Sequence, residues 1–182
     1  MSTMSTKTTL FVAVIWLTCT AVAFGQDAVP MAKAELHNGR GELVGIATLA
    51  ETINGFRVVA QVYGLRPGYH GFHVHEVGKC EPPGFKSAGE HFNPYDAQHG
   101  LKDPKGFHAG DLPNLLVAPD GTGVLVAYAP HTTLRAAQNS LFHDGGTAVV
   151  VHSQPDDQRA DPSGNSGDRL ACGGVSRAIP GT

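Results

Sequence analysis

The sequence predicts an all-β protein, an antiparallel sandwich or barrel of about eight strands with two long functional loops. Three observations support this class. Short segments of alternating apolar and polar residues follow one another from residue 31 onward, turn residues separate these segments, and no amphipathic helix of any length occurs. Strands of this kind bury one face and leave the other to solvent or to a covering loop.

Six segments have the alternation expected of strands, at residues 31–36, 43–50, 56–63, 71–77, 123–129 and 147–152. Asn-Gly or Asp-Gly pairs at 38–39, 54–55 and 120–121 lie between strand segments. Such pairs supply the positive φ angles that tight hairpins need. The spacing therefore predicts several hairpins between neighbouring strands.

Two long segments interrupt the strands, at residues 78–114 and 153–170, and both are rich in Gly, Pro, Asp and Asn. Loops of this length are usually functional, disordered or held in place by cross-links. The first contains a cysteine, three histidines and Asp111, and the second leads to Cys172. We therefore expect the functional residues to lie on these two loops.

The chain length of 182 residues fits one domain. Residues 1–25 have the layout of a secretory signal peptide, with Lys7 before an apolar stretch at 10–16 and small residues near its end. We expect cleavage near Ala23 or Gly25 and a mature domain at 26–182. The apolar stretch is too short to span a bilayer and no later segment replaces it, so no integral membrane segment is expected.

The net charge of −3 argues against a nucleic-acid partner.

The cysteines agree with export from the cytoplasm. Cys19 lies in the predicted signal, so its removal leaves Cys80 and Cys172, a pair expected to form a disulfide in an oxidising compartment. The alternative is a lipoprotein with Cys19 as the lipidated residue, although Trp16, Leu17 and Thr18 suit a lipidation signal poorly. We expect an extracytoplasmic protein in the periplasm, with secretion to the exterior as the alternative.

The segment 71–77 presents two histidines together. Side chains alternate across a strand, so His73 and His75 share one face while Phe72 and Val74 point into the core. A His-x-His pair alone is weak evidence for a metal, because exposed strand faces often carry histidine. Its meaning depends on what the loops add.

The first loop adds three imidazoles and a carboxylate, which satisfy the coordination of tetrahedral zinc: His91, His99, His108 and Asp111. His152, at the end of an apolar strand, completes a second set with His73, His75 and His91. Four imidazoles suit copper. The sequence therefore predicts two metal sites built mainly from histidine.

Three motifs resemble the copper/zinc superoxide dismutase family: GFHVHE at 71–76, GFHAGDLPN at 106–114 and GNSGDRLACG at 164–173. The likeness runs from about residue 32 to 173 and suggests a bacterial-type member with a Greek-key barrel. It implies one copper and one zinc per subunit. It assigns copper to His73, His75, His91 and His152, and zinc to His91, His99, His108 and Asp111. His91 then bridges the two ions, which requires loss of both ring protons.

The resemblance also implies roles for Arg169 and Asp156. Arg169 matches the residue that attracts and orients superoxide beside copper, and fixed charge of this kind speeds association. Asp156 matches an aspartate that accepts hydrogen bonds from one copper ligand and one zinc ligand, here His73 and His99. Asp157 is adjacent and is an alternative for this role. A second alternative is that the two aspartates form only a solvated turn. Lys79 and Lys105 are further candidates for attracting an anion.

The implied activity is the conversion of two superoxide anions and two protons into oxygen and hydrogen peroxide, with copper alternating between Cu(II) and Cu(I) and His91 supplying a proton. The rival classes are a non-catalytic periplasmic copper/zinc-binding protein and a structural β-domain that contains zinc. Storage requires neither the bridge nor Arg169. The family usually continues after its second cysteine with Gly-Val-Ile, whereas this chain has Gly173, Gly174 and Val175. That region often lies near a subunit contact, so a homodimer is expected only as one option.

Overall fold

The computed structural model describes residue 29 and residues 31–178. The predicted signal peptide, with Cys19 and both cleavage positions, lies outside the described residues. The described chain forms ten strands and one short 3₁₀ helix: β1 (Met31–Asn38), β2 (Leu43–Thr52), β3 (Gly55–Val62), β4 (Gly68–His70), β5 (Phe72–His75), η1 (Lys86–Ala88), β6 (Leu115–Val117), β7 (Gly123–Ala129), β8 (Ala148–His152), β9 (Arg169–Gly174) and β10 (Ser176–Ala178). The all-β prediction is confirmed.

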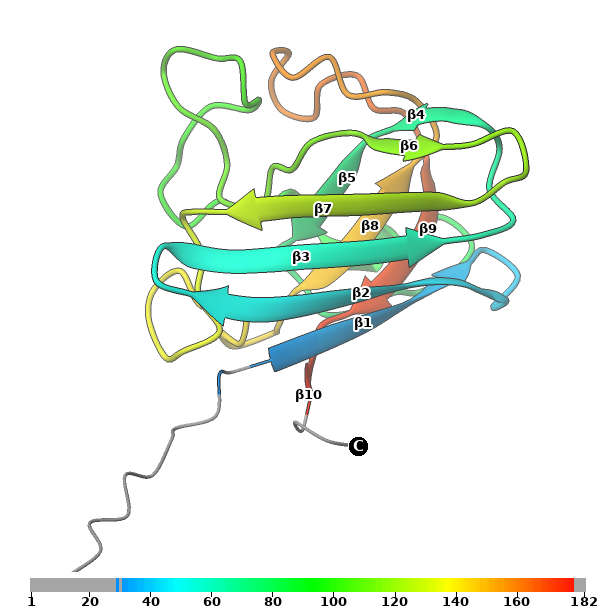
Figure 1. Cartoon of the computed structure of the whole chain (residues 1–182). Coiled ribbons are helices and arrows are strands. Elements are labelled where there is room, and N and C mark those ends of the chain that lie inside the picture. Colours follow the sequence, from blue (N-terminus) through cyan, green and yellow to red (C-terminus); the bar gives the residue numbers. More distant parts are fainter. Residues whose placement is uncertain (1–28, 30, 179–182) are drawn as a thin grey trace, which may run out of the picture.

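The strands form one antiparallel sheet in the order β4-β6-β7-β3-β2-β1-β9-β8-β5, with β10 added to β1 (Figure 1). Only Gly71 separates β4 from β5 along the chain, although these strands stand at opposite ends of the sheet order. The two ends of the sheet are therefore neighbours, and the sheet curls into a nearly closed barrel. A closed sheet leaves few unpaired edges.

The six predicted strands all form, and the structure adds four that the alternation did not reveal. β4, β6 and β10 have three residues each, too few to show a period of two. β9 begins at Arg169, so the second loop ends slightly earlier than predicted. After Gly174 the chain continues as β10 against β1. The strand count is therefore ten where about eight were expected.

Alternation places the core inside the barrel. On β3 the side chains of Phe56, Val58 and Ala60 are fully buried, while the residues between them are partly exposed. β7 has the same pattern, with Val124, Val126 and Tyr128 outward. Each fully buried apolar side chain stabilises the fold by roughly 1.5–3 kcal/mol relative to exposure.

The two long loops lie next to each other over one end of the barrel (Figure 1). Backbone hydrogen bonds connect them: Lys102 donates to the carbonyl of Gln158, and the amide of His99 donates to the side chain of Asp161. The described residues contain no helix long and apolar enough to cross a membrane. The fold thus presents a rigid barrel with two loops packed together at the place where the histidines converge.

Candidate metal centre

β5 presents His73 and His75 on one face, as the alternation predicts. The register places His73 opposite Val150 and His75 opposite Ala148 on β8. This face lies outside the barrel core, yet both imidazoles are buried, with exposed fractions of 0% and 1%. The reason is that the loop 78–114 covers the face that would otherwise meet water.

Backbone hydrogen bonds fix the loop against β5. Val74 donates to the carbonyl of Gly110 and accepts from the amide of Phe92. These contacts place His91 opposite His75 and Asp111 opposite His73. Gly110 is required for this close approach, because a Cβ there would overlap the carbonyl of Val74. Two separate parts of one loop are thus brought to the strand that carries the His-x-His pair.

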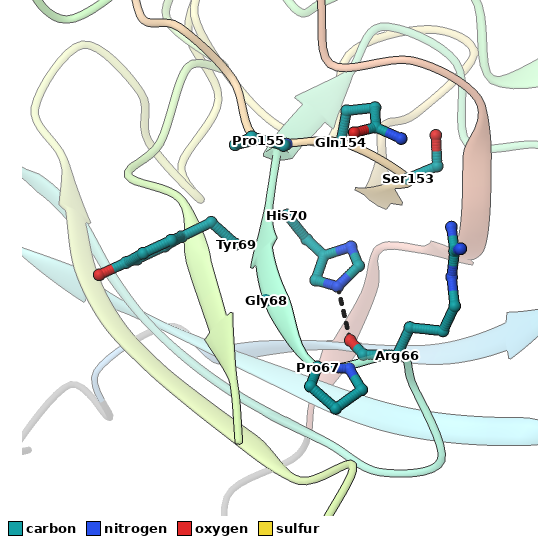
Figure 2. A pocket seen from close by; sticks show the side chains of 8 residues that line it. All are labelled: Arg66, Pro67, Gly68, Tyr69, His70, Ser153, Gln154 and Pro155. Carbon is teal, nitrogen blue, oxygen red and sulfur yellow. Dashed lines mark hydrogen bonds between the residues drawn. The ribbon is translucent and has the colours of Figure 1, made fainter. Parts of the chain in front are cut away.

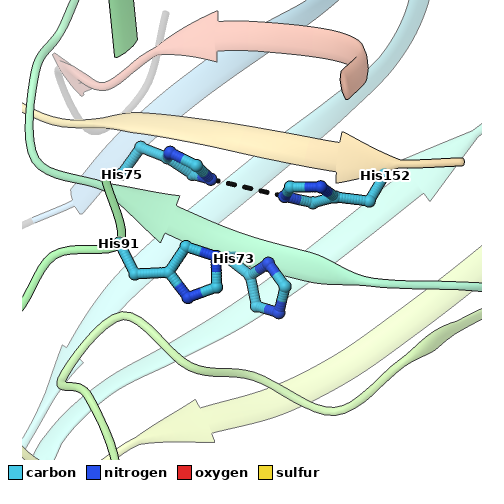
Figure 3. Close-up of side chains that lie close together, drawn as sticks. All are labelled: His73, His75, His91 and His152. Atoms are coloured by element: carbon cyan, nitrogen blue, oxygen red, sulfur yellow. Dashed lines mark hydrogen bonds between the residues drawn. The ribbon is translucent and has the colours of Figure 1, made fainter. Parts of the chain in front are cut away.

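One group of side chains consists of imidazoles only: His73, His75, His91 and His152. Figure 3 shows them converging from β5, from β8 and from the loop. The Nε2 atoms of His75 and His152 face each other at 3.4 Å, and the ring centroids of His73 and His91 are 4.0 Å apart. One ligand atom from each of the four lies within 4.8 Å of the others. This arrangement can hold a single metal ion.

A second group comes wholly from the loop: His91, His99, His108 and Asp111. The Oδ1 atom of Asp111 lies 2.9 Å from Nδ1 of His91, 3.1 Å from Nδ1 of His99 and 3.4 Å from Nδ1 of His108. The Oδ2 atom of Asp111 accepts the amides of Gly100 and His108, which holds the carboxylate in place. The structure therefore brings together every residue of both predicted ligand sets.

The buried ring nitrogens show that this space fits metal ions. Four of them have no hydrogen-bond partner among the described residues: Nδ1 of His73, Nε2 of His91, Nδ1 of His99 and Nδ1 of His108. A buried polar atom without a partner is costly. Metal coordination satisfies such nitrogens, and imidazole suits both copper and zinc.

Burial keeps the imidazoles of the first group neutral. Burial lowers the pKa of His91 to about 3 and that of His152 to about 2, with a further contribution from the positive charge that a protonated His73 would carry. The pKa of His75 lies well below its usual value, chiefly because of burial. A neutral imidazole can coordinate a metal without first losing a proton.

The loop group is more strongly charged. Burial of His99 opposes its charged form, but the nearby carboxylates of Asp111 and Asp156 outweigh burial and raise the pKa of His99 to about 9. Burial also opposes ionisation of Asp111, yet the neighbouring imidazoles, His108 foremost, hold its pKa well below the usual range. Two buried carboxylates therefore attract positive charge to this group.

Asp156 connects the two groups. Its Oδ2 lies 2.7 Å from Nε2 of His73 and its Oδ1 lies 3.1 Å from Nε2 of His99. The side chain of Asn114 anchors Asp156 by hydrogen bonds to its backbone amide and carbonyl. Gly164 leaves room for the carboxylate, since a Cβ there would overlap it. The histidines therefore orient their other nitrogens toward the metal positions.

The neighbouring aspartate has a different place. Asp157 is exposed, and its carboxylate accepts the amides of Arg159 and Ala160 within a turn. The side chain that faces the histidines is that of Asp156. Sequence reasoning missed Asn114 as the anchor of Asp156. Its position at the end of the GFHAGDLPN motif was the available signal.

Arg169 lies beside the first group because β9 pairs it with His152 on β8. Its guanidinium donates to the carbonyls of Phe85, at 2.7 Å, and Gly89, at 2.6 Å. The Gly89 carbonyl also contacts Nδ1 of His75 at 2.9 Å. Burial lowers the pKa of Arg169 from its usual value, but a guanidinium remains charged at neutral pH.

A hollow of about 310 Å³ opens at this guanidinium, and Lys86 of η1 also lines it. The sequence interpretation proposed Lys79 and Lys105 as additional cations, and neither lines this hollow. Lys86 was missed because no motif contains it; only the fold of the loop brings η1 to Arg169.

The predicted disulfide is confirmed. Cys80 and Cys172 are bonded, with Cα atoms 5.6 Å apart and a sequence separation of 92. The bond ties the beginning of the first loop to β9. Around Cys172 lies a small apolar cluster of Phe85, Ala88, Ala148 and Val150. Loop and sheet are thus joined covalently and by packing next to the histidines.

His70 supports the site without joining either group. It is buried, and its ring nitrogens lie 2.7 Å from the carbonyl of His152 and 2.8 Å from the carbonyl of Arg66 (Figure 2). It therefore connects β4 to the end of β8. His37, His131 and His143 also belong to neither ligand group.

Comparison with known proteins identifies the family. The family model described as copper/zinc superoxide dismutase matches residues 43–175. The chain belongs to the copper/zinc superoxide dismutase family. The match covers both ligand groups, both cysteines and Arg169.

Relatives of this dismutase family cover most of the chain. "Superoxide dismutase [Cu-Zn] 2" of Aquifex aeolicus is 48% identical, covering 84% of this chain and 90% of the relative. "Superoxide dismutase [Cu-Zn]" of Caulobacter vibrioides is 39% identical, covering 78% of this chain and 83% of the relative. The crystal structure of a dismutase-like protein from Bacillus subtilis superposes with a TM-score of 0.75 at 40% identity, covering 78% of this chain and 96% of that one. Family and fold agree along the described chain.

Proposed function

We propose that the protein is a superoxide dismutase that uses one copper and one zinc ion per subunit. The observation that carries this proposal is the pair of complete, buried ligand groups sharing His91, with their inward nitrogens free of other partners. A non-catalytic copper/zinc-binding protein would need neither the shared histidine nor a half-buried guanidinium beside one group. The rival function is therefore not favoured.

The geometry of the two groups supports the proposed ligand assignment. Copper would be held by His73, His75, His91 and His152, and zinc by His91, His99, His108 and Asp111. The all-imidazole set suits copper, and three imidazoles with one carboxylate suit tetrahedral zinc. Asp156 orients one histidine of each set.

The activity is the disproportionation of two superoxide anions and two protons to oxygen and hydrogen peroxide, for which bound copper supplies the one-electron redox chemistry. Arg169 binds and orients the anion at the hollow, because its guanidinium is fixed by two backbone carbonyls. His91 can hold and release a proton at Nε2, the nitrogen without a hydrogen-bond partner. Asp111 holds the opposite nitrogen of the same ring.

A direct assay tests this proposal. The purified protein is loaded until elemental analysis shows one copper and one zinc per chain, and superoxide decay is followed by pulse radiolysis. We expect decay far above the spontaneous rate. A fully loaded protein that leaves the decay rate unchanged would refute the enzymatic function and favour metal storage.

We also propose that residues 1–25 are a signal peptide that directs the domain 26–182 to the periplasm. The charge and apolar pattern of this segment supports export, and so does the Cys80–Cys172 disulfide, because such bonds persist in oxidising compartments. A relative from the nematode Brugia pahangi is named an extracellular dismutase. The N-terminal sequence and cellular fraction of the mature protein would test both statements.

The finer proposal on partners is a homodimer. Five exposed apolar side chains lie on the outer face of β4, β6 and β7: Tyr69, Leu116, Val124, Val126 and Tyr128. Asp120 lies three residues before β7, and Arg57 pairs with Tyr128 at the other end of that strand. A second copy related by a two-fold axis through β7 would bring the Asp120 end of one copy toward the Arg57 end of the other. This apolar face, with opposite charges at its two ends, is therefore complementary to the same face of a second copy.

Light scattering tests this contact. The parent protein is expected at the mass of a dimer, and Val126→Glu is expected at the mass of a monomer, because two like charges would meet near the axis. Thr48→Glu, an outward position on β2 outside the apolar face, is the matched control. A monomeric parent protein, or a dimer that survives Val126→Glu, would contradict this contact.

A further inference from the structure

A second opening, distinct from the hollow at Arg169 but sharing Glu90 with it, reaches the metal centre. It is a pocket of about 350 Å³, and its floor includes His91 and His108, two members of the loop ligand group. These imidazoles are buried, with exposed fractions of 4% and 6%. A pocket that ends on buried metal ligands offers an ion a path to them.

Four carboxylates line this pocket: Glu76, Glu90, Asp96 and Asp161. Among the described residues that line it there is no lysine or arginine. The hollow at Arg169 differs, because two cations and two carboxylates line it, Glu90 being common to both. The metal centre therefore has one opening with a net negative lining and another with balanced charges.

Two of the four carboxylates accept hydrogen bonds from the backbone of the described residues, and two do not. Oε1 of Glu76 accepts the amide of Glu90, and Oδ1 of Asp161 accepts the amide of His99. The carboxylates of Glu90 and Asp96 have no hydrogen bond to another residue in the described part of the chain. The charge of Asp96 is thus free to act on an ion in the pocket, while that of Glu90 acts on Arg169 as well.

The negative charge of this pocket disfavours the entry of superoxide. A lining of four carboxylates repels superoxide and would slow its approach by this route, whereas it attracts a divalent cation. At the end of the pocket, Nδ1 of His108 has no hydrogen-bond partner, so the imidazole is ready to coordinate. The carboxylates that repel superoxide therefore attract a divalent cation.

We propose that this acidic pocket is the entrance through which zinc reaches its ligands, separate from the opening that admits superoxide. The proposal rests on the zinc assignment made above and adds the route. The pocket carboxylates raise the local concentration of the cation and speed its association with the loop group. The hollow at Arg169 serves the anion.

Zinc association with the metal-free full-length mature chain tests the route. Zinc chloride is mixed with the protein in a stopped-flow instrument, and free zinc is followed with a fluorescent indicator. The pocket variant combines Glu76→Gln, Glu90→Gln and Asp96→Asn. The matched control combines Glu35→Gln, Glu81→Gln and Asp144→Asn, three exposed acids outside the pocket with the same loss of net charge.

In about 10 mM salt, where charges act over roughly 30 Å, we expect the pocket variant to bind zinc about tenfold more slowly than the control. The difference should shrink as salt is added. The zinc dissociation rate, measured by chelator competition, should stay unchanged. Asp96→Asn alone is expected to slow association about twofold, in proportion to its share of the charge removed, and it is a mild change, since Asn adopts the positive φ of 52° found here.

Two results would overturn the route. Equal association rates for the pocket and control variants would mean that zinc enters elsewhere. Faster dissociation with unchanged association would mean that the carboxylates hold the ligand group together instead of guiding the ion. Failure of the parent chain to take up zinc would refute the zinc assignment itself, a result distinct from equal rates in two zinc-binding variants.

Discussion

The two ligand groups are built on different supports. Three of the four imidazoles of the group proposed for copper stand on β5 and β8, where strand register sets their positions. The group proposed for zinc comes wholly from the loop 78–114. In the first group burial keeps the imidazoles neutral, whereas in the second buried carboxylates attract charge. A sheet can position ligands in advance, but a loop needs cross-links, carboxylates and the metal itself to hold its ligands.

Removing one ligand from each group gives the largest expected effect. His152→Ala should lose copper and all copper-dependent activity while it retains zinc, because the loop group is intact. His108→Ala should lose zinc and retain the strand-borne copper ligands. Elemental analysis of both variants after loading with both metals, together with superoxide decay, measures this. Equal loss of both metals from His152→Ala would contradict two separate groups.

The disulfide supports the loop more than the sheet. Replacing both Cys80 and Cys172 with serine removes a cross-link that spans 92 positions, and we expect the free energy of unfolding to fall by about 2–5 kcal/mol. Urea unfolding of the metal-free variant and parent measures this. Zinc affinity should fall more than copper affinity. An equal fall in both would show that loop and sheet depend on the bond alike.

Asp156→Asn tests the link between the groups. His73 and His99 contact different oxygens of Asp156, and an amide has an acceptor at only one of these two positions. Loss of such a partner costs about 10–100-fold in metal affinity, and we expect this loss for both metals. Asp157→Asn, in the exposed turn, is the matched control with unchanged affinity. Competition titrations with chelators provide the values.

Arg169→Ala should slow the enzyme by about tenfold at low salt, because the anion loses its fixed cation. Copper and zinc contents should stay at the parent level, since Arg169 contacts only backbone carbonyls. Superoxide decay at several salt concentrations checks this. Kinetics equal to those of the parent would remove Arg169 from substrate attraction.

The pH dependence of zinc binding distinguishes the two groups by the protons that they carry. His99 must be neutral to bind zinc, but its pKa of about 9 keeps it protonated at neutral pH in the metal-free protein. Zinc affinity should therefore rise about tenfold per pH unit between pH 7 and pH 9, where one proton is displaced. Proton release measured with a pH indicator should be about one per zinc from this residue. Affinity independent of pH in this range would show that His99 is already neutral.

The sequence predicted this fold and site unevenly. The long strands and the His-x-His pair follow from a period of two, which is a local property. The short strands β4 and β6 arise from barrel closure, a tertiary effect that three residues cannot encode. The choice between Asp156 and Asp157 and the position of Lys86 depend on how the loops fold back. The alternation of apolar and polar residues also could not predict the loop contacts that bury His73 and His75.

The forked contact of Asp156 has a consequence for how the metals bind. One carboxylate orients both His73, a proposed copper ligand, and His99, a proposed zinc ligand, and His91 belongs to both groups. An ion that fixes one of these histidines also fixes the Asp156 carboxylate, and the carboxylate then holds the other histidine in place. Binding of the two metals is then cooperative, and thermodynamic reciprocity requires that zinc change the copper affinity by the same factor by which copper changes the zinc affinity.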